Sequence, residues 1–259
     1  MKRAVAPVYA RRFSVDGDRL RAAILCFHEV GHGAGALDPI RFREHLCWLS
    51  DHHRVVALDE VVARLEKGPD PHHDDEPMVA VTFDDGYKEP LDLMLDVLDE
   101  TRISATAFVS PALLGAHAYW RFDRVPPLWN ESDVERWLRA GHSVGSHSLT
   151  HSDLTIVTDV ELQQEVELSK AALSRLGVDD PAGFAYPWGK STRREVQAVK
   201  RAGYRYAVTA SPGTRLASDQ IFEIPRLMVD PDDSVRDLGA KIRGGYDWTS
   251  AIRAVTASS

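Results

Sequence analysis

Asp84 and Asp85 stand directly after an apolar and β-branched run, residues 79–83 (VAVTF), and directly before Gly86. The run predicts a buried strand, because it does not alternate apolar with polar residues and is short for a helix. Successive side chains on a strand point to opposite faces, so the two acids can share one site only if the chain turns at Gly86. Such a pair suits a metal ligand beside a group that transfers a proton. The alternative is a plain turn, in which Asp-Gly is common.

His147 and His151 form a second candidate set, four residues apart. This spacing places two imidazoles on one side of a helical turn. Two imidazole nitrogens and one carboxylate oxygen make a three-ligand metal site that leaves a coordination position for water. A metal held in this way lowers the pKa of that water and polarises a carbonyl group. Each histidine alone is more often structural, so the hypothesis of a metal hydrolase depends on both sets together.

The elements that must position these residues alternate between strand and helix along the chain. Strands are predicted at residues 22–27, 54–57, 79–83, 105–109, 142–146, 184–186, 206–209 and 221–224, with helices between most of them. This alternation predicts parallel strands with helical crossovers, in a barrel or a doubly wound sheet. No glycine-rich phosphate fingerprint follows the first strand, which favours the barrel. In a barrel, the polar groups at the strand ends meet at one mouth.

Composition excludes several classes of protein. The 259 residues carry a net charge of −8 and 44% hydrophobic residues, as expected for a globular protein that does not bind nucleic acid. Cys26 and Cys47 are predicted to be reduced core thiols. No signal peptide or transmembrane segment is evident, so we expect a cytoplasmic protein with no membrane span. The sequence leaves the oligomeric state open.

The predicted domain organisation is simple. Residues 1–20 are expected to form an N-terminal tail or edge segment, and residues 21–259 a single domain. The polar loop 70–77 carries adjacent histidines and is expected to be solvated. A long connection, residues 111–130, contains Trp120 and Trp129. These aromatics either line a cleft or pack the connection onto the core.

A family resemblance rests on two motifs in this order. Residues 82–86 (TFDDG) followed by residues 147–151 (HSLTH) resemble the first two motifs of the polysaccharide deacetylases, the NodB-homology or carbohydrate esterase 4 family. The similarity covers about residues 22–245. It implies an α/β fold with a distorted (β/α)7-type barrel. It also implies a hydrolase that removes N-acetyl groups from N-acetylated poly- or oligosaccharides of the GlcNAc type and releases acetate. The implied cofactor is a divalent metal, usually Zn²⁺, with Co²⁺, Ni²⁺ or Fe²⁺ left open.

The resemblance also implies roles by position. Asp84 matches the catalytic base, and the metal ligands match Asp85, His147 and His151. Ser148 and Thr150 would support the ligand loop by hydrogen bonds. Residues 186–189 (YPWG) resemble the third motif, so that Tyr186, Pro187 and Trp188 are the expected oxyanion and substrate residues. The backbone N–H of Trp188 is the expected oxyanion donor.

Two positions depart from the usual family pattern. Ala185 stands where the third motif normally has an arginine that pairs with the base, and no histidine follows His151 to act as general acid. The circularly permuted poly-N-acetylglucosamine deacetylases resemble this chain more closely. In that branch the acid lies on an N-terminal strand, which matches His28; the alternative is a structural histidine. Arg226 is either a replacement for the lost positive charge or, as we favour from sequence, a surface arginine.

Three functions therefore stay open at this point. The first is sugar N-deacetylation. The second is hydrolysis of sugar O-acetyl esters or non-sugar amides at the same site. The third is a non-catalytic carbohydrate-binding relative, for which Ala185 and the missing histidine argue; an intact Asp84 argues against it.

Overall fold

The computed structural model describes residues 19–68, 77–121 and 124–247. Most of the predicted tail 1–20 and nearly all of the loop 70–77 lie outside the described residues. The strands are β1 (Leu20–Phe27), β2 (Arg54–Val55), β3 (Met78–Asp84), β4 (Ala105–Val109), β5 (Ser143–Ser146), β6 (Gly183–Ala185), β7 (Tyr206–Val208), β8 (Arg215–Leu216) and β9 (Leu227–Met228). The α-helices are α2 (Pro39–His52), α3 (Leu58–Lys67), α4 (Leu91–Thr101), α5 (Glu131–Arg139), α6 (Asp159–Arg175), α7 (Arg193–Arg201) and α8 (Val235–Ile242). Short 3₁₀ helices are η2 (Pro111–Leu113), η3 (Pro187–Gly189) and η4 (Ser218–Gln220).

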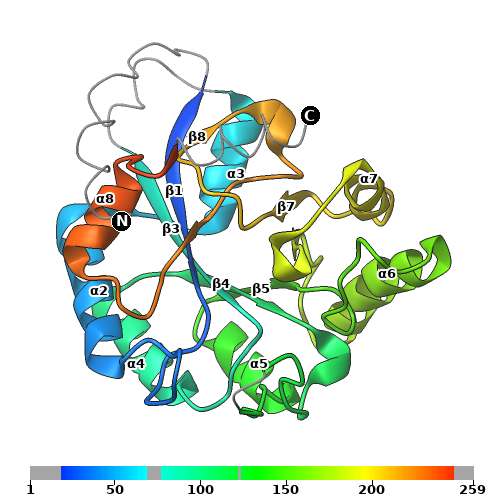
Figure 1. Cartoon of the computed structure of the whole chain (residues 1–259), viewed down its shortest axis with the longest axis horizontal. Coiled ribbons are helices and arrows are strands. Elements are labelled where there is room, and N and C mark those ends of the chain that lie inside the picture. Colours follow the sequence, from blue (N-terminus) through cyan, green and yellow to red (C-terminus); the bar gives the residue numbers. More distant parts are fainter. Residues whose placement is uncertain (1–18, 69–76, 122–123, 248–259) are drawn as a thin grey trace.

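The strands form one sheet with the order β7-β6-β5-β4-β3-β1-β8. Every neighbouring pair from β7 to β1 is parallel, and only β8 runs antiparallel to its neighbour. Helices lie around the outside of these strands (Figure 1). Parallel neighbours joined by helical crossovers bring all the carboxyl ends of the strands to one side of the molecule.

A segment near the C-terminus links the two edges of this sheet. The backbone N–H of Thr209, just after β7, donates to the carbonyl of Ile224. Three residues later, β9 pairs in parallel with β1, Leu25 opposite Leu227. The segment 224–228 thus lies between β7 and β1, which closes the sheet into the distorted barrel that the sequence predicts.

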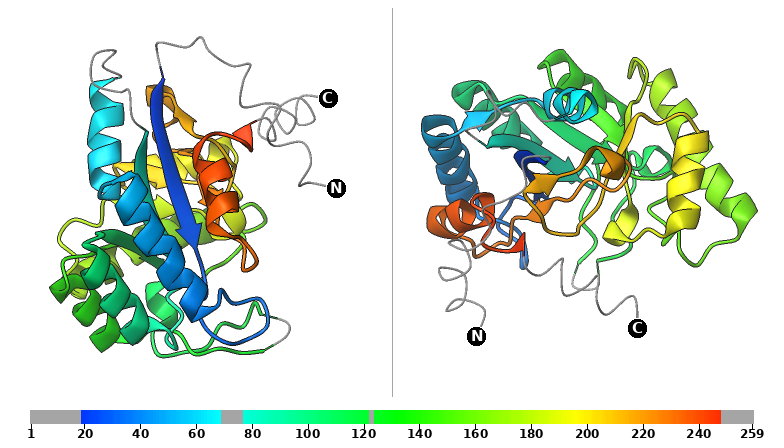
Figure 2. Two further views of the ribbon diagram at one scale, coloured as in Figure 1. Left: turned by 90° about the vertical axis from the view of Figure 1, so that its left-hand side faces the viewer. Right: turned by 90° about the horizontal axis from the view of Figure 1, so that it is seen from above.

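The strands are buried on both faces. All seven residues of β3 are buried, which agrees with its apolar and β-branched sequence up to Asp84. Apolar side chains from β1, β3 and β4 pack against α2, α4 and α5 in the largest core cluster. Helix α8 packs beside α2 and also contacts β1, so that an element near the C-terminal end covers the first strand (Figure 2).

The sequence placed most elements correctly, but not all of them. Residues 221–224 do not form a strand; Ile224 makes only an isolated bridge to Val208. The short strands β8 and β9 were not predicted, because two residues give no readable periodicity.

Among the described residues, no helix is both long enough and apolar enough to cross a membrane.

Candidate active site

A cavity of about 540 Å³ opens at the carboxyl ends of the strands. Six of the eight predicted site residues line it: His28, Asp84, Asp85, His147, His151 and Trp188. They lie at or just after the carboxyl ends of four different strands, β1, β3, β5 and β6, which the sheet brings together. The expected convergence at one mouth is confirmed.

The turn after β3 lets two adjacent carboxylates face the same cavity. Asp84 is the last residue of β3, and Asp85 has a positive φ of 73°. Gly86 continues the turn with a φ of 71°, and its N–H donates to the Asp84 carbonyl at 3.0 Å. The left-handed backbone at Asp85 breaks the strand alternation that would otherwise send the two side chains to opposite faces. A non-glycine residue held in this region carries strain of about 1–3 kcal/mol, and such strain clusters at functional sites.

Asp85, His147 and His151 form a set with the geometry of a metal site. One atom from each lies within 4.8 Å of the others. Asp85 Oδ1 is 3.6 Å from His147 Nε2 and 3.2 Å from His151 Nε2. This oxygen is buried and has no hydrogen-bond partner among the described residues. A buried carboxylate oxygen facing two imidazole nitrogens fits a bound divalent cation, which would satisfy all three atoms.

A hydrogen bond behind His147 orients it for this purpose. Its Nδ1 lies 2.8 Å from the carbonyl oxygen of Ala185. Because a carbonyl can only accept, Nδ1 carries the proton and Nε2 presents its lone pair to the cavity. Ala185 thus contributes through its backbone, at the position where the usual family motif has an arginine side chain.

The loop carrying the two histidines is a turn and not the helical turn that the spacing predicted. Ser148 and His151 both have positive φ, 62° and 58°. Ser148 Oγ accepts the N–H of His151 at 3.0 Å, which supports the loop as expected. Thr150 contributes differently, by donating its hydroxyl to the Glu165 carboxylate at 2.5 Å.

Glu165, which sequence reasoning missed, holds this loop from α6. Its Oε2 accepts the backbone N–H groups of Leu149 and Thr150 at 3.0 and 2.9 Å. A buried carboxylate that accepts several hydrogen bonds fixes the conformation of a turn, which lacks the regular backbone hydrogen bonds of a helix or a strand. The sequence signal was the isolated acid among the buried positions of an otherwise amphipathic helix.

Asp84 is paired with Arg226 and not with the metal set. The guanidinium donates to both carboxylate oxygens, from Nη1 to Oδ1 at 2.7 Å and from Nη2 to Oδ2 at 2.6 Å. Both side chains are almost fully buried. Arg226 is therefore not a surface arginine, and the interpretation favoured from sequence was wrong. It supplies the positive charge that Ala185 does not.

The pKa values of the two carboxylates are lowered by different neighbouring residues. Burial alone raises the pKa of Asp84, but the Arg226 charge outweighs it and holds that pKa well below its usual range. For Asp85, burial is outweighed by the contact with His151, which lowers its pKa to about 2. Burial lowers the pKa of His147 to about 4, so its imidazole is neutral at pH 7 and able to bind a metal. Both acids are thus ionised in neutral solution.

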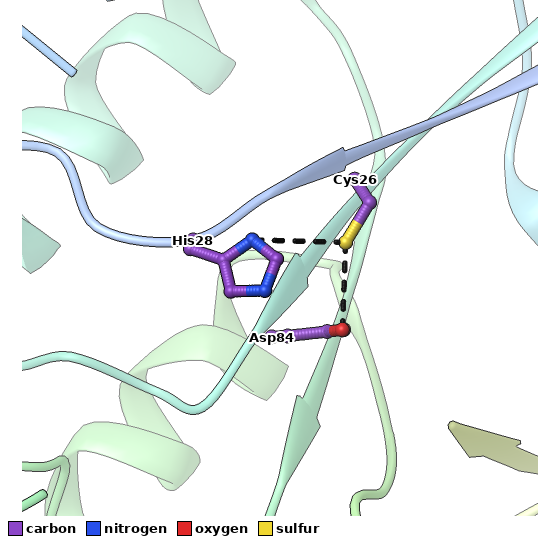
Figure 3. Close-up of side chains that lie close together, drawn as sticks. All are labelled: Cys26, His28 and Asp84. Carbon is purple, nitrogen blue, oxygen red and sulfur yellow. Dashed lines mark hydrogen bonds between the residues drawn. The ribbon is translucent and has the colours of Figure 1, made fainter. Parts of the chain in front are cut away.

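His28 lies on the other side of Asp84 and is linked to it through Cys26 (Figure 3). The Cys26 thiol donates to Asp84 Oδ2 at 3.4 Å and lies 3.9 Å from His28 Nδ1. Burial raises the pKa of this thiol, which keeps it protonated and able to donate. Cys26 is free and buried, as predicted for a core thiol, whereas Cys47 is free but only half-buried. The contact of Cys26 with the candidate base could not be predicted from the sequence.

Of the three residues expected from the third motif, only Trp188 lines the cavity. Trp188 lines the cavity with an exposed indole, and its backbone has a φ of 61°. Tyr186 points away into the core, where its hydroxyl donates to the carbonyl of Phe222 at 3.0 Å. Pro187 is buried and does not line the cavity.

Comparison with known proteins decides which family has this arrangement. The family model of the polysaccharide deacetylases matches residues 72–207, more than half of the chain. The chain belongs to the polysaccharide deacetylase family. The resemblance inferred from the motifs is confirmed, and with it the class of enzyme, a deacetylase acting on carbohydrate.

Relatives and solved structures agree with this membership. The polysaccharide deacetylase YxkH of Bacillus subtilis is 25% identical over 221 residues, covering 85% of this chain and 75% of that protein. A poly-β-1,6-N-acetyl-D-glucosamine N-deacetylase of Staphylococcus epidermidis is 22% identical over 197 residues, covering 74% of this chain and 67% of that protein. IcaB from Ammonifex degensii has the same fold, with a TM-score of 0.75 at 21% identity over 88% of this chain and 99% of that one. The Streptococcus pyogenes deacetylase PplD, solved with acetate, has a TM-score of 0.73 at 18% identity. The match covers 86% of this chain and 99% of that one.

The buried pair of Asp84 and Arg226 should contribute to the stability of the fold. Arg226→Met leaves the Asp84 carboxylate buried without a countercharge, and we expect the free energy of unfolding at pH 7 to fall by about 3–5 kcal/mol. Urea denaturation of the metal-free protein measures this.

The pH dependence of the free energy of unfolding should also reverse in Arg226→Met. In the parent protein the lowered pKa of Asp84 adds stability above the unfolded value of about 3.9, and this contribution is lost as the pH falls further. In Arg226→Met burial raises that pKa, so stability should increase as the pH falls toward 5. Equal stability of the two proteins at pH 7 would contradict the pairing.

Proposed function

We propose that this protein is a metal-dependent N-deacetylase that hydrolyses the acetamido groups of N-acetylglucosamine-type poly- or oligosaccharides and releases acetate. The observation that carries the proposal is the arrangement around β3. A candidate base held by a buried arginine lies next to three ligand atoms in one open cavity. The named activity of the staphylococcal relatives on poly-β-1,6-N-acetyl-D-glucosamine supports the choice of sugar.

Asp85, His147 and His151 would hold the cation, with their Nε2 and Oδ1 atoms facing one point. When bound, such an ion polarises the substrate carbonyl and lowers the pKa of a water molecule. Two imidazoles and one carboxylate suit Zn²⁺, and the same donors accept Co²⁺, Ni²⁺ or Fe²⁺. We propose Zn²⁺ as the resident ion.

Asp84 would act as the general base. Its Oδ2 lies 4.0 Å from His147 Nε2, on the side of the ligand set, so it can reach a water located there. Arg226 holds both oxygens in place and keeps the carboxylate ionised until it takes the proton. Because both Asp84 oxygens accept hydrogen bonds from the guanidinium, the carboxylate has little freedom to move during proton transfer.

Trp188 and His28 would complete the reaction. The Trp188 N–H would donate to the oxygen that gains negative charge when water attacks the acetamide carbon. His28 would give a proton to the leaving amine nitrogen, so that acetate and a free amino sugar are released. Tyr186 and Pro187 would set the backbone turn that presents this N–H, since their side chains do not line the cavity.

The alternatives raised by the sequence are separated by one substrate panel. The panel compares β-1,6-linked N-acetylglucosamine oligomers, an O-acetylated sugar without N-acetyl groups, and a simple non-sugar acetamide. We expect acetate release chiefly from the first, measured in the metal-loaded protein. Turnover of the ester or the simple amide alone would assign the site to another hydrolase. Binding of the oligomers without acetate release would support the non-catalytic alternative.

Loss of the candidate base and loss of a candidate metal ligand should have different effects. Asp84→Asn removes the base but no metal ligand, so we expect acetate release to fall by about 10²–10⁴-fold with the bound metal nearly unchanged. His147→Ala removes a ligand and should lose both metal and activity. Metal content by elemental analysis and acetate release, measured on the same preparations, test the division of roles. Full activity in either variant would contradict it.

The role of His28 has its own test. His28→Gln keeps a polar side chain but cannot donate a proton to a poor leaving group. We expect hydrolysis of an N-acetylated sugar to fall by about 10²–10⁴-fold. An activated aryl acetate, whose leaving group needs no proton, should lose far less. Equal losses on both substrates would make His28 a structural histidine.

A further inference from the structure

Trp120 lies against the candidate metal site, although it belongs to the long connection between β4 and α5. Its indole stacks on the His151 ring, with the two ring centroids 3.9 Å apart and an interplanar angle of 16°. The indole is almost fully buried and lines the same cavity. The stack covers one face of a residue whose Nε2 points toward Asp85.

His151 differs from His147 in what holds its ring. The Nδ1 of His147 bonds a backbone carbonyl, whereas the Nδ1 of His151 is buried with no hydrogen-bond partner among the described residues. A ligating histidine is normally oriented by a bond from its second nitrogen. For His151 the flat contact with Trp120 supplies the restraint that the missing bond would give.

The connection is fastened where it carries Trp120. Trp120 and Tyr87 pack with Ala118 and Leu128 in a small cluster separate from the main cores. The neighbouring Tyr119 donates its hydroxyl to the carbonyl of Thr150, inside the histidine loop, at 2.8 Å. The indole is therefore fixed relative to the ligands on both sides.

We propose that Trp120 is a positioning residue of the metal site, which orients His151 by stacking on its ring. The stack restrains the ligand whose second ring nitrogen has no hydrogen-bond partner among the described residues. The inference rests on the proposed function only in requiring that Asp85, His147 and His151 bind a metal. The competing explanation is that Trp120 merely fills space in the cluster.

The experiment measures the dissociation constant for Zn²⁺ by competition with a chromogenic chelator, in the whole 259-residue chain. Loss of such supporting partners weakens metal binding by about 10–100-fold. Trp120→Phe keeps a smaller stacking ring, and we expect an affinity weaker by up to about tenfold. Trp120→Ala loses the stack and should approach a hundredfold.

Trp137→Phe is the matched control. Its indole is also buried, and its N–H donates to the backbone carbonyl of Ser143, but the residue contacts none of the three ligands. Thermal unfolding of the metal-free proteins should show comparable losses of stability for Trp137→Phe and Trp120→Phe. Only the Trp120 variant should change the Zn²⁺ affinity, and only it should shift the visible absorption bands of the Co²⁺-substituted protein.

Two outcomes would overturn the inference, and they are distinguishable. If the parent protein binds Zn²⁺ tightly and both Trp120 variants bind it equally well, with unchanged Co²⁺ spectra, Trp120 is a packing residue and the proposed function stands. If the parent protein binds no divalent metal, the proposed function and the inference fail together.

Discussion

Two ionised carboxylates buried side by side at the end of β3 are the constraint on which the rest of the site depends. Neither could remain charged in such a place without compensation, because desolvation of one buried ion costs several kcal/mol. The fold compensates them separately. Arg226 neutralises Asp84 from one side, and the histidine pair faces Asp85 from the other. The unequal surroundings give two chemically identical side chains different proposed tasks.

The barrel is arranged so that these compensating groups arrive from distant parts of the chain. Arg226 precedes β9, the strand that pairs with β1 at the closure of the sheet. The histidines follow β5, and Glu165 of α6 holds their loop by its backbone. Local backbone strain at Asp85, Ser148 and His151 is tolerated because each turn is fixed by bonds from a neighbouring element.

Sequence reasoning found the site where chemistry depends on residue type and failed where it depends on geometry. Asp84, Asp85, His147, His151 and His28 could be named because carboxylates and imidazoles at strand ends carry a recognisable signal. Arg226 was misjudged because an isolated arginine gives no sign of burial, and its partner lies 142 positions away. The left-handed turn at 147–151 was taken for a helical one, since a spacing of four does not distinguish them. Trp120 was seen as either cleft or packing, and it serves as both.

The separation between Asp84 and Arg226 also bears on how the molecule reaches its native state. A pair formed by residues so far apart in sequence forms only after much of the chain between them has folded. Until then Asp84 has no buried cation beside it, and the end of β3 favours contact with water. In the folded chain the segment 224–228 lies between β7 and β1 and places the guanidinium against Asp84. One short segment therefore both closes the barrel and supplies the countercharge of the candidate base.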